Sequence, residues 1–447
     1  MTDDTTTEDD ATAGPRNGAR EPERRADSQI TRRRALSAGA VCLAGALAGC
    51  ASEGGSDRPA GSTAEGEETD GSGTGEGGGP TLARVEDPPD AVYVPTHFEA
   101  MRHLDPIRAG PYEVVPMVTY PHAFWTVTGE TVERTEPSGA EDVHLMVTVR
   151  DPETKAVIPA ETGLELTVGR ESESGSTHVP WPMVSQEMGL HAGDNVPLGE
   201  DGTYEVTVRV GAVDARLTGD YAGRFDESGT GTFTFTFDDE FRSEVVEGIV
   251  YVAEGDRGRR GALANAMARM GSQGAEENSD TTEEPHPNGV ERWRGGEAGH
   301  RYGTYERAPD AGDLPPADAL PGTLQGRPVT GDAVLATTLI ASGSRFVDDD
   351  ERYLAVSPRT PYNRSSLPMT ALSYEQRREG ESVSSGPLTG TLDHELGYHY
   401  GAALSDARTG DAVTLTVDTP PQAARHAGYQ TAFREMPPVE VELEVPE

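Results

Sequence analysis

The chain has 447 residues, enough for two or three ordinary domains, but only 34% are hydrophobic and 53 are glycine and 33 proline, so much of the length is loop or linker. The formal net charge of −40 comes from 77 acidic against 37 basic residues, and Lys155 is the only lysine. Such a surface repels polyanions, which argues against nucleic acid as a partner, and it suits a halophilic protein kept soluble in concentrated salt.

The first predicted element is an export signal over residues 1–50. In "TRRRALSAGAVCLAGALAGC", consecutive arginines at 32–34 precede an apolar run over residues 35–49. This run is shorter than the roughly 20 residues that a bilayer-spanning helix needs. The arginines resemble a Tat signal, and Leu-Ala-Gly-Cys resembles a lipobox whose cysteine, Cys50, would carry the lipid. An ordinary signal with a chance cysteine is the alternative.

The two cysteines restrict the chemistry of any metal site. Cys42 would be removed with the signal and Cys50 would be consumed by lipid, so a site must use methionine, histidine and carboxylates. We expect an exported protein, anchored by lipid to the outer face of the cytoplasmic membrane. Residues 51–84 are rich in Gly, Ser, Thr and Glu and predict a disordered tether.

Strand patterns dominate the remaining chain. Over residues 85–252, segments such as "DVHLMVTVR" and "TYEVTVRV" alternate apolar and polar residues between turn residues. Residues 253–327 are poor in apolar residues and predict a long linker, with a short helix around "ALANAMARM". Alternation resumes over residues 328–447, for example in "AVTLTVDT". The predicted fold class is therefore all-β, with two β-sandwich domains joined by a long linker.

A repeat connects the two predicted domains. "QEMGLHAGDNV" at 186–196 aligns without gaps with "HELGYHYGAAL" at 394–404, so that His191 falls on His399. An alternating strand follows in each copy, and then Arg216 falls on Arg425. Three landmarks in the same order, at a shift of 208–209 residues, predict duplication of one β-domain.

Methionine and histidine are concentrated before residue 192. Five of the ten methionines and six of the eleven histidines lie between residues 95 and 191. Thioether and imidazole together suit copper, Cu(I) above all, and added carboxylates would admit Fe(II). In "DVHLMVTVR" the aliphatic residues share one face, so His144 and Met146 point to the other. The alternative is that the methionines fill gaps under loops and the histidine braces a turn. The predicted ligands are Met146, Met183, Met188 and His191.

The second copy of the repeat has candidate metal ligands of its own. Met188 falls there on Leu396, and the place of Met183 falls on Thr391 or a near neighbour, so these methionines indicate specialisation of the first copy. Because a histidine is present in both copies, as His191 and His399, its role could be structural. A second His/Asp metal site remains a hypothesis, with Asp393, His394, His399 and His426 as its residues.

The segment "PMVSQEMGLHAGDNV", with the strand and the Arg-x-Thr-Gly segment that follow it, resembles the periplasmic iron-transport lipoprotein family. The resemblance covers residues 92–238 well and 330–435 faintly, and it implies immunoglobulin-like β-sandwiches that bind metal and accompany iron permeases. Met183 and His191 match the family's metal-binding methionine and histidine. Met146 stands where the family has a glutamate, and Leu217 stands where it has a second histidine, which the second copy keeps as His426.

Motifs of common enzymes are absent from the sequence, which has no phosphate-binding glycine motif, nucleophile elbow, paired zinc cysteines or His-Glu-x-x-His. We therefore expect a protein that is not an enzyme: a lipid-anchored cell-surface protein that binds copper or ferrous iron in support of iron uptake. A membrane iron permease is the expected partner, and a homodimer is left open. The alternatives are a surface β-sandwich that binds a protein or glycan, with the methionines as core, and a copper redox enzyme.

Overall fold

A computed structural model describes residues 80–445, except 160–162, 171–172, 264–313 and 349. All of them fall within Thr69–Glu447, one of the two units into which the chain divides. The predicted signal, residues 51–79 of the tether and most of the linker with its short helix lie outside the described residues. Among those described, no helix has both the length and the apolar character needed to span a bilayer.

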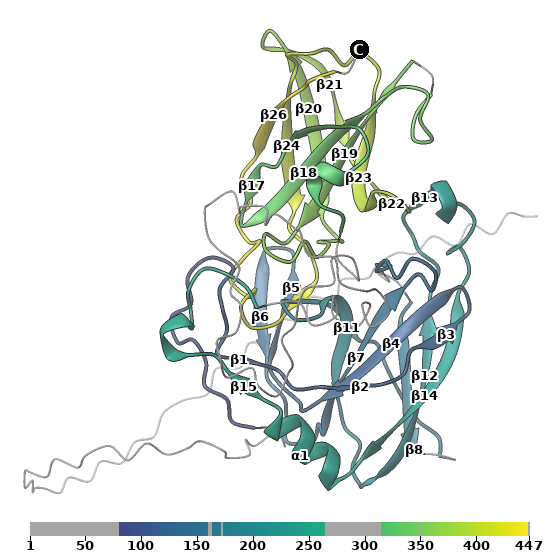
Figure 1. The fold of residues 1–447 in the computed structure, drawn as a ribbon, viewed down its shortest axis with the longest axis vertical. Coiled ribbons are helices and arrows are strands. Elements are labelled where there is room, and N and C mark those ends of the chain that lie inside the picture. Colours follow the sequence, from purple (N-terminus) through teal and green to yellow (C-terminus); the bar gives the residue numbers. More distant parts are fainter. Residues whose placement is uncertain (1–79, 160–162, 171–172, 264–313, 349, 446–447) are drawn as a thin grey trace, which may run out of the picture. The chain divides into compact units, whose positions relative to one another are not determined.

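The described chain is all-β, as the sequence predicts (Figure 1). Its first sandwich pairs a nine-stranded with a four-stranded sheet. In order, the larger sheet contains β2 (Arg102–His103), β4 (Tyr112–Thr119), β7 (Val143–Arg150), β11 (Gly189–Val196), β10 (Trp181–Ser185), β25 (Ala424–Arg425), β5 (Phe124–Thr128) and β6 (Thr131–Thr135), with β3 (Ile107–Ala109) beside β4. The smaller sheet contains β14 (Gly229–Phe237), β12 (Gly202–Val210), β8 (Glu165–Arg170) and β9 (Ser176–His178).

The second sandwich pairs a seven-stranded with a four-stranded sheet. The larger sheet contains, in order, β13 (Arg216–Thr218), β22 (Thr389–Asp393), β23 (Gly397–Leu404), β19 (Arg352–Arg359), β18 (Ala333–Ile340) and β16 (Thr323–Gly326), with β17 (Val329–Thr330) beside β18. The smaller sheet contains β21 (Glu381–Pro387), β20 (Ala371–Arg378), β24 (Ala412–Thr419) and β26 (Val439–Glu442).

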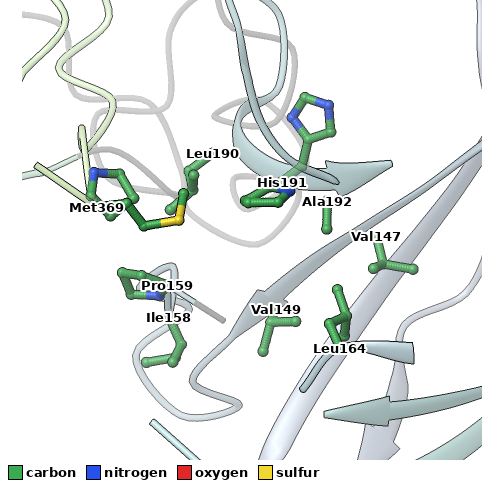
Figure 2. A pocket seen from close by; sticks show the side chains of 11 residues that line it. Val147, Val149, Ile158, Pro159, Leu164, Leu190, His191, Ala192 and Met369 are labelled. Carbon is green, nitrogen blue, oxygen red and sulfur yellow. The ribbon is translucent and has the colours of Figure 1, made fainter. Parts of the chain in front are cut away.

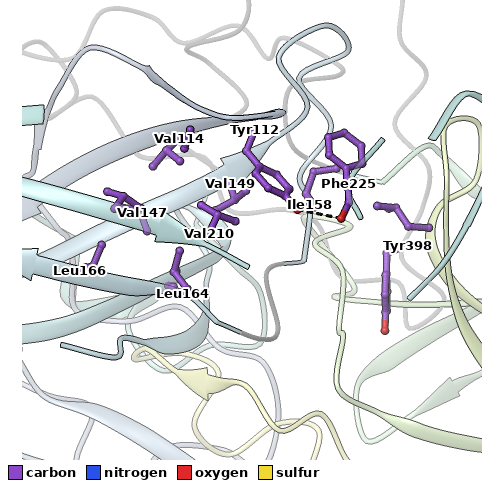
Figure 3. Packing of buried hydrophobic residues seen from close by; sticks show 14 of the residues in the cluster. Tyr112, Val114, Val147, Val149, Ile158, Leu164, Leu166, Val210, Phe225 and Tyr398 are labelled. Atoms are coloured by element: carbon purple, nitrogen blue, oxygen red, sulfur yellow. Dashed lines mark hydrogen bonds between the residues drawn. The ribbon is translucent and has the colours of Figure 1, made fainter. Parts of the chain in front are cut away.

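Alternating side chains decide which face of each strand is the core face. In β7, Leu145 and Val147 pack in the main core, whereas His144 and Met146 lie on the opposite face, as the alternation predicts. Figure 3 shows Val147 of β7 with Leu166 of β8 and other members of this core. We call the opposite face of the larger first sheet its outer face. Because this face is also buried, its polar side chains are enclosed by protein.

Each sandwich contributes one short strand to the larger sheet of the other. β13 follows the first sandwich's strand β12 in the chain but pairs with β22, in parallel. β25 lies near the C-terminus but pairs in parallel with β10 and antiparallel with β5. Sequence patterns do not predict this exchange. Its consequence is that residues just after β25 lie at the outer face of the first sheet.

Few helical segments accompany the strands. In α1 (Asp239–Glu247) the side chain of Asp238 accepts a hydrogen bond from Phe241 N, and Phe241 and Val245 share the buried face, one helical turn apart. This helix was not predicted from the sequence. A two-stranded ribbon joins β1 (His97–Phe98) to β15 (Val250–Tyr251). The remaining elements are the 3₁₀ turns η1 (Gly219–Tyr221), η2 (Glu254–Asp256) and η3 (Ala317–Ala319).

Candidate metal centre

Four histidines meet at the outer face of the first sheet. His144 lies on β7 and His191 on β11, while His122 precedes β5 and His426 follows β25. Because β25 pairs within the first sheet, His426 from near the C-terminus lies beside His191, and the Nε2 atoms of these two residues are 3.3 Å apart. His122, His144 and His426 each offer a ring nitrogen, and these three atoms lie within 4.8 Å of one another.

Three of the rings are held at Nδ1. His122 Nδ1 lies 3.2 Å from the carbonyl oxygen of Tyr120, and His191 Nδ1 lies 3.1 Å from that of Gly189. His144 Nδ1 lies 2.8 Å from Oδ1 of Asn195. Each acceptor requires Nδ1 to carry the proton, so the neutral rings have their lone pairs at Nε2. An oriented imidazole with a free Nε2 is the usual form of a histidine metal ligand.

Several of these ring nitrogens lack a partner. Nε2 of His122, Nε2 of His144 and Nδ1 of His426 are buried without a hydrogen-bond partner among the described residues. Buried polar atoms are almost always paired, since leaving one unpaired costs about 1–3 kcal/mol. Convergent, unpaired nitrogen donors fit a transition-metal ion, for which imidazole is a common ligand.

Burial keeps three of these histidines neutral. It lowers the pKa of His122 to about 4 and that of His191 to about 3, and it holds the pKa of His144 well below its ordinary value. The other rings of the cluster oppose protonation further, because two imidazolium ions at this separation repel each other. Nε2 is therefore available to a metal ion well below neutral pH.

A carboxylate completes the cluster. Glu99, which follows β1, places Oε1 3.8 Å from Nε2 of His122 and 3.7 Å from Nδ1 of His426. Burial alone would raise the pKa of Glu99, but attraction to His122 and His426 more than offsets it, and the pKa lies well below the ordinary value. Glu99 was not predicted from the sequence, because no motif surrounds it.

Glycine at position 193 makes room for the cluster. Gly193 is the cross-strand partner of Met146 on β7. A Cβ atom added to Gly193 would lie 2.8 Å from Nε2 of His144 and 3.1 Å from Cγ of Met146. The His144 ring therefore lies directly over this glycine.

The predicted ligands divide into two groups. Met183 is the cross-strand partner of His191, is fully buried and packs with Phe124 and Ala424, so it lies at the histidine cluster. Met146 and Met188 instead pack in a separate methionine cluster on the same face. His122, His144 and His426 complete the centre. Strand alternation predicted that His144 lies on this face, His426 was predicted for a second-copy site, and His122 was not predicted.

The residues predicted for a second-copy site are brought together only in part: His394 Nδ1 lies 3.9 Å from Oδ2 of Asp393. His426 belongs to the cluster of the first sheet. Asp393 is buried and bound by Arg345, at 2.7 and 2.8 Å, and by Thr218, and hydrogen bonds from these side chains overcome the effect of burial and lower its pKa. His394 is a quarter exposed, with Nδ1 3.2 Å from the backbone nitrogen of Asp220.

His399 repeats the anchoring of His191 but not its surroundings. Its Nδ1 lies 3.0 Å from the carbonyl oxygen of Gly397, as His191 Nδ1 lies near that of Gly189. Its Nε2 lies 3.2 Å from the hydroxyl of Tyr353. Tyr353 is the residue of β19 that aligns with His144 of β7. A phenol thus occupies the space that an imidazole occupies in the first sandwich.

A small apolar pocket adjoins β11 on the core side. Its lining includes Val147, Val149, Leu190 and, from the second sandwich, Met369. In Figure 2 the His191 ring lies on the other side of the strand from Ala192 and the aliphatic side chains. The pocket therefore borders the histidine cluster without containing it.

Comparisons with known proteins give one family match and nine matching chains of solved structures, two of which are described below. Residues 318–442 match a domain family of unknown function, DUF7350. No curated protein matches the chain. FetP from uropathogenic Escherichia coli strain F11, as isolated, is 20% identical over 32% of this chain and 95% of its own, with a TM-score of 0.25. A copper-bound FetP variant is 19% identical over 31% of this chain and 97% of its own, with a TM-score of 0.25.

Proposed function

We propose that this protein is an exported, lipid-anchored metal-binding protein that holds copper or ferrous iron at the outer face of its first sheet and passes it to a membrane iron permease. The proposed ligands are the imidazoles of His122, His144, His191 and His426, with Met183 and Glu99 beside them. The protein is proposed to bind and deliver the ion without catalysis.

One observation carries this proposal: His122, His144 and His426 offer ring nitrogens within 4.8 Å of one another, and each of these rings has a buried nitrogen without a hydrogen-bond partner. A core built only for stability would pair these atoms or replace them with aliphatic groups. The imidazole nitrogens suit both copper and Fe(II), the nearby thioether favours Cu(I), and the carboxylate favours harder ions such as Fe(II), so the donor set is compatible with either metal.

The ordering of the rings supports a binding role as well. Backbone carbonyls and Asn195 fix three rings before any ion arrives, so less conformational entropy is lost on binding. Because burial keeps the rings neutral, an ion need not displace protons near neutral pH. These features favour uptake of an ion from dilute solution.

Metal titration of the tagless mature chain in concentrated salt tests the proposal. Cu(I), Cu(II) and Fe(II) are titrated against the wild type, His191→Ala and His399→Ala. The two substitutions remove equally buried rings with the same anchoring at Nδ1, but only His191 faces the cluster. Stoichiometric binding lost in His191→Ala and kept in His399→Ala is expected. A wild type that binds none of these ions tightly would overturn the proposal and favour a surface module for a protein or glycan.

The anchor is tested separately. Mass spectrometry of the N-terminal peptide from host membranes is expected to show a lipid on Cys50. A peptide that begins elsewhere, or that carries a free thiol at Cys50, would contradict the proposed attachment without bearing on metal binding.

A further inference from the structure

Four methionines of the first sandwich form a cluster of their own. Met117 of β4, Met146 of β7 and Met188, in the turn before β11, are at most 2% exposed and pack with Val115. Met101, which precedes β2, is partly buried against them. These four residues, which we call the methionine cluster, are separate from the main core.

The positions of this cluster do not require methionine. Met117 and Met146 are cross-strand partners, and in the second sandwich Thr338 and Ala355 form the corresponding pair. Met188 aligns with Leu396. There, Ala355 and Leu396 pack with Phe346 and Tyr353, with no thioether. The same strand framework is thus filled without sulfur where the histidine cluster is missing.

The core face of the same strands shows the same contrast. β4 and β7 place Val114, Val118, Leu145 and Val147 in the main core, and none of these is methionine. Methionine on these two strands is confined to the outer face, where the histidines lie. Gly193 joins the clusters, because His144 and Met146 both lie over it.

We propose that Met101, Met117, Met146 and Met188 form a second metal site, which binds a soft monovalent ion, Cu(I), through thioether sulfur. Uncharged thioethers bind Cu(I) in preference to harder divalent ions and need lose no proton. Met101, the member that is only partly buried, gives the site its contact with solvent. The neighbouring histidine cluster, with its carboxylate, would hold a separate ion.

Silver(I) and Cu(I) titrations of the full mature chain test this site. Ag(I) is a probe for Cu(I) that is stable in air. The wild type is expected to bind two Ag(I) ions per chain, and the double variant Met117→Leu/Met146→Leu only one. Met436→Leu, a buried methionine in a different cluster, is the matched control and should keep both. Methionine and leucine have similar volumes, so the variants should fold, and circular dichroism checks this.

Methyl groups of methionine labelled with ¹³C report the site directly. In His144→Ala/His426→Ala, which removes two of the three converging imidazoles, Ag(I) is expected to shift the methyl resonances of the four cluster residues, and X-ray absorption of the Cu(I) form should show sulfur as the main ligand. Unmoved resonances, or a folded Met117→Leu/Met146→Leu variant that binds as many ions as the wild type, would overturn the second site. Loss of binding in His191→Ala alone would concern only the histidine centre.

Discussion

Replacing Gly193 with alanine places a methyl group against a proposed metal ligand. The new Cβ would lie 2.8 Å from Nε2 of His144, closer than side-chain atoms normally approach. The ring cannot turn away freely, because Asn195 holds its Nδ1 at 2.8 Å. The other neighbour, Met146, is fully buried. The methyl group must therefore displace either the ligand or the packing around it.

Gly193→Ala has two expected effects of similar size, one on folding stability and one on metal affinity. Overpacking of a buried site usually costs about 1–3 kcal/mol, which we expect as the loss in free energy of unfolding of the metal-free protein. Displacement of an oriented ligand typically weakens metal affinity roughly 10–100-fold, or about 1.4–2.7 kcal/mol. Because the methyl group lies against the ligand atom itself, we expect both losses together.

Denaturant unfolding and competitive metal titration measure the two effects. Gly255→Ala is the control, because nothing lies within 4 Å of its added Cβ and its backbone is not left-handed. That variant should resemble the wild type in both assays. A Gly193→Ala protein with unchanged metal affinity would refute the placement of His144 Nε2 in the site, whatever its stability.

Three further predictions follow from the same residues. Metal binding to His122 and His191 at pH 6 should release almost no protons from these rings, because burial keeps the pKa of His122 near 4 and that of His191 near 3, and calorimetry of His426→Ala in buffers of different ionisation enthalpy would expose any release. The metal-free protein should lose stability as the pH falls from 6.5 toward 4, since unfolded histidines then bind protons that the folded ones do not. For His122 alone the loss is about 3 kcal/mol, measurable by denaturant titration, and a flat profile would contradict it. Asn195→Ala should weaken metal binding roughly 10–100-fold by releasing His144 Nδ1, and an unchanged titration would show that this hydrogen bond does not orient the ligand.

Much of the fold could be predicted because the alternation of apolar and polar residues along a strand shows which of its faces is buried in the core. That pattern placed Leu145 and Val147 in the core and His144 and Met146 opposite, and the structure confirms this. The exchange of β13 and β25 between the sandwiches could not be predicted. These strands have only three and two residues, too few for a pattern that would indicate which strands they pair with. The helix α1 was missed because its nine residues bury only Phe241 and Val245.

Local motifs identified only part of the candidate site. Met183 and His191 were predicted from one stretch of sequence, and as cross-strand partners they do lie together. His122 and Glu99 stand outside regular strands, so no periodicity marks the direction of their side chains. His426 belongs by sequence to the second copy, and only the pairing of β25 with β10 carries it to the first sheet.

The two sandwiches put one turn to different uses. Gly189 and Gly397 both have φ close to +68°, a conformation that glycine adopts without strain, and each turn presents a carbonyl to the histidine two residues later. In the second sandwich Tyr353 gives that histidine a partner. In the first, His144 takes the tyrosine's place and its Nε2 is left unpaired. Each unpaired buried nitrogen costs about 1–3 kcal/mol in the metal-free chain. A bound ion would offset that cost. Metal binding therefore explains why histidines occupy positions at which an aromatic core would make the metal-free chain more stable.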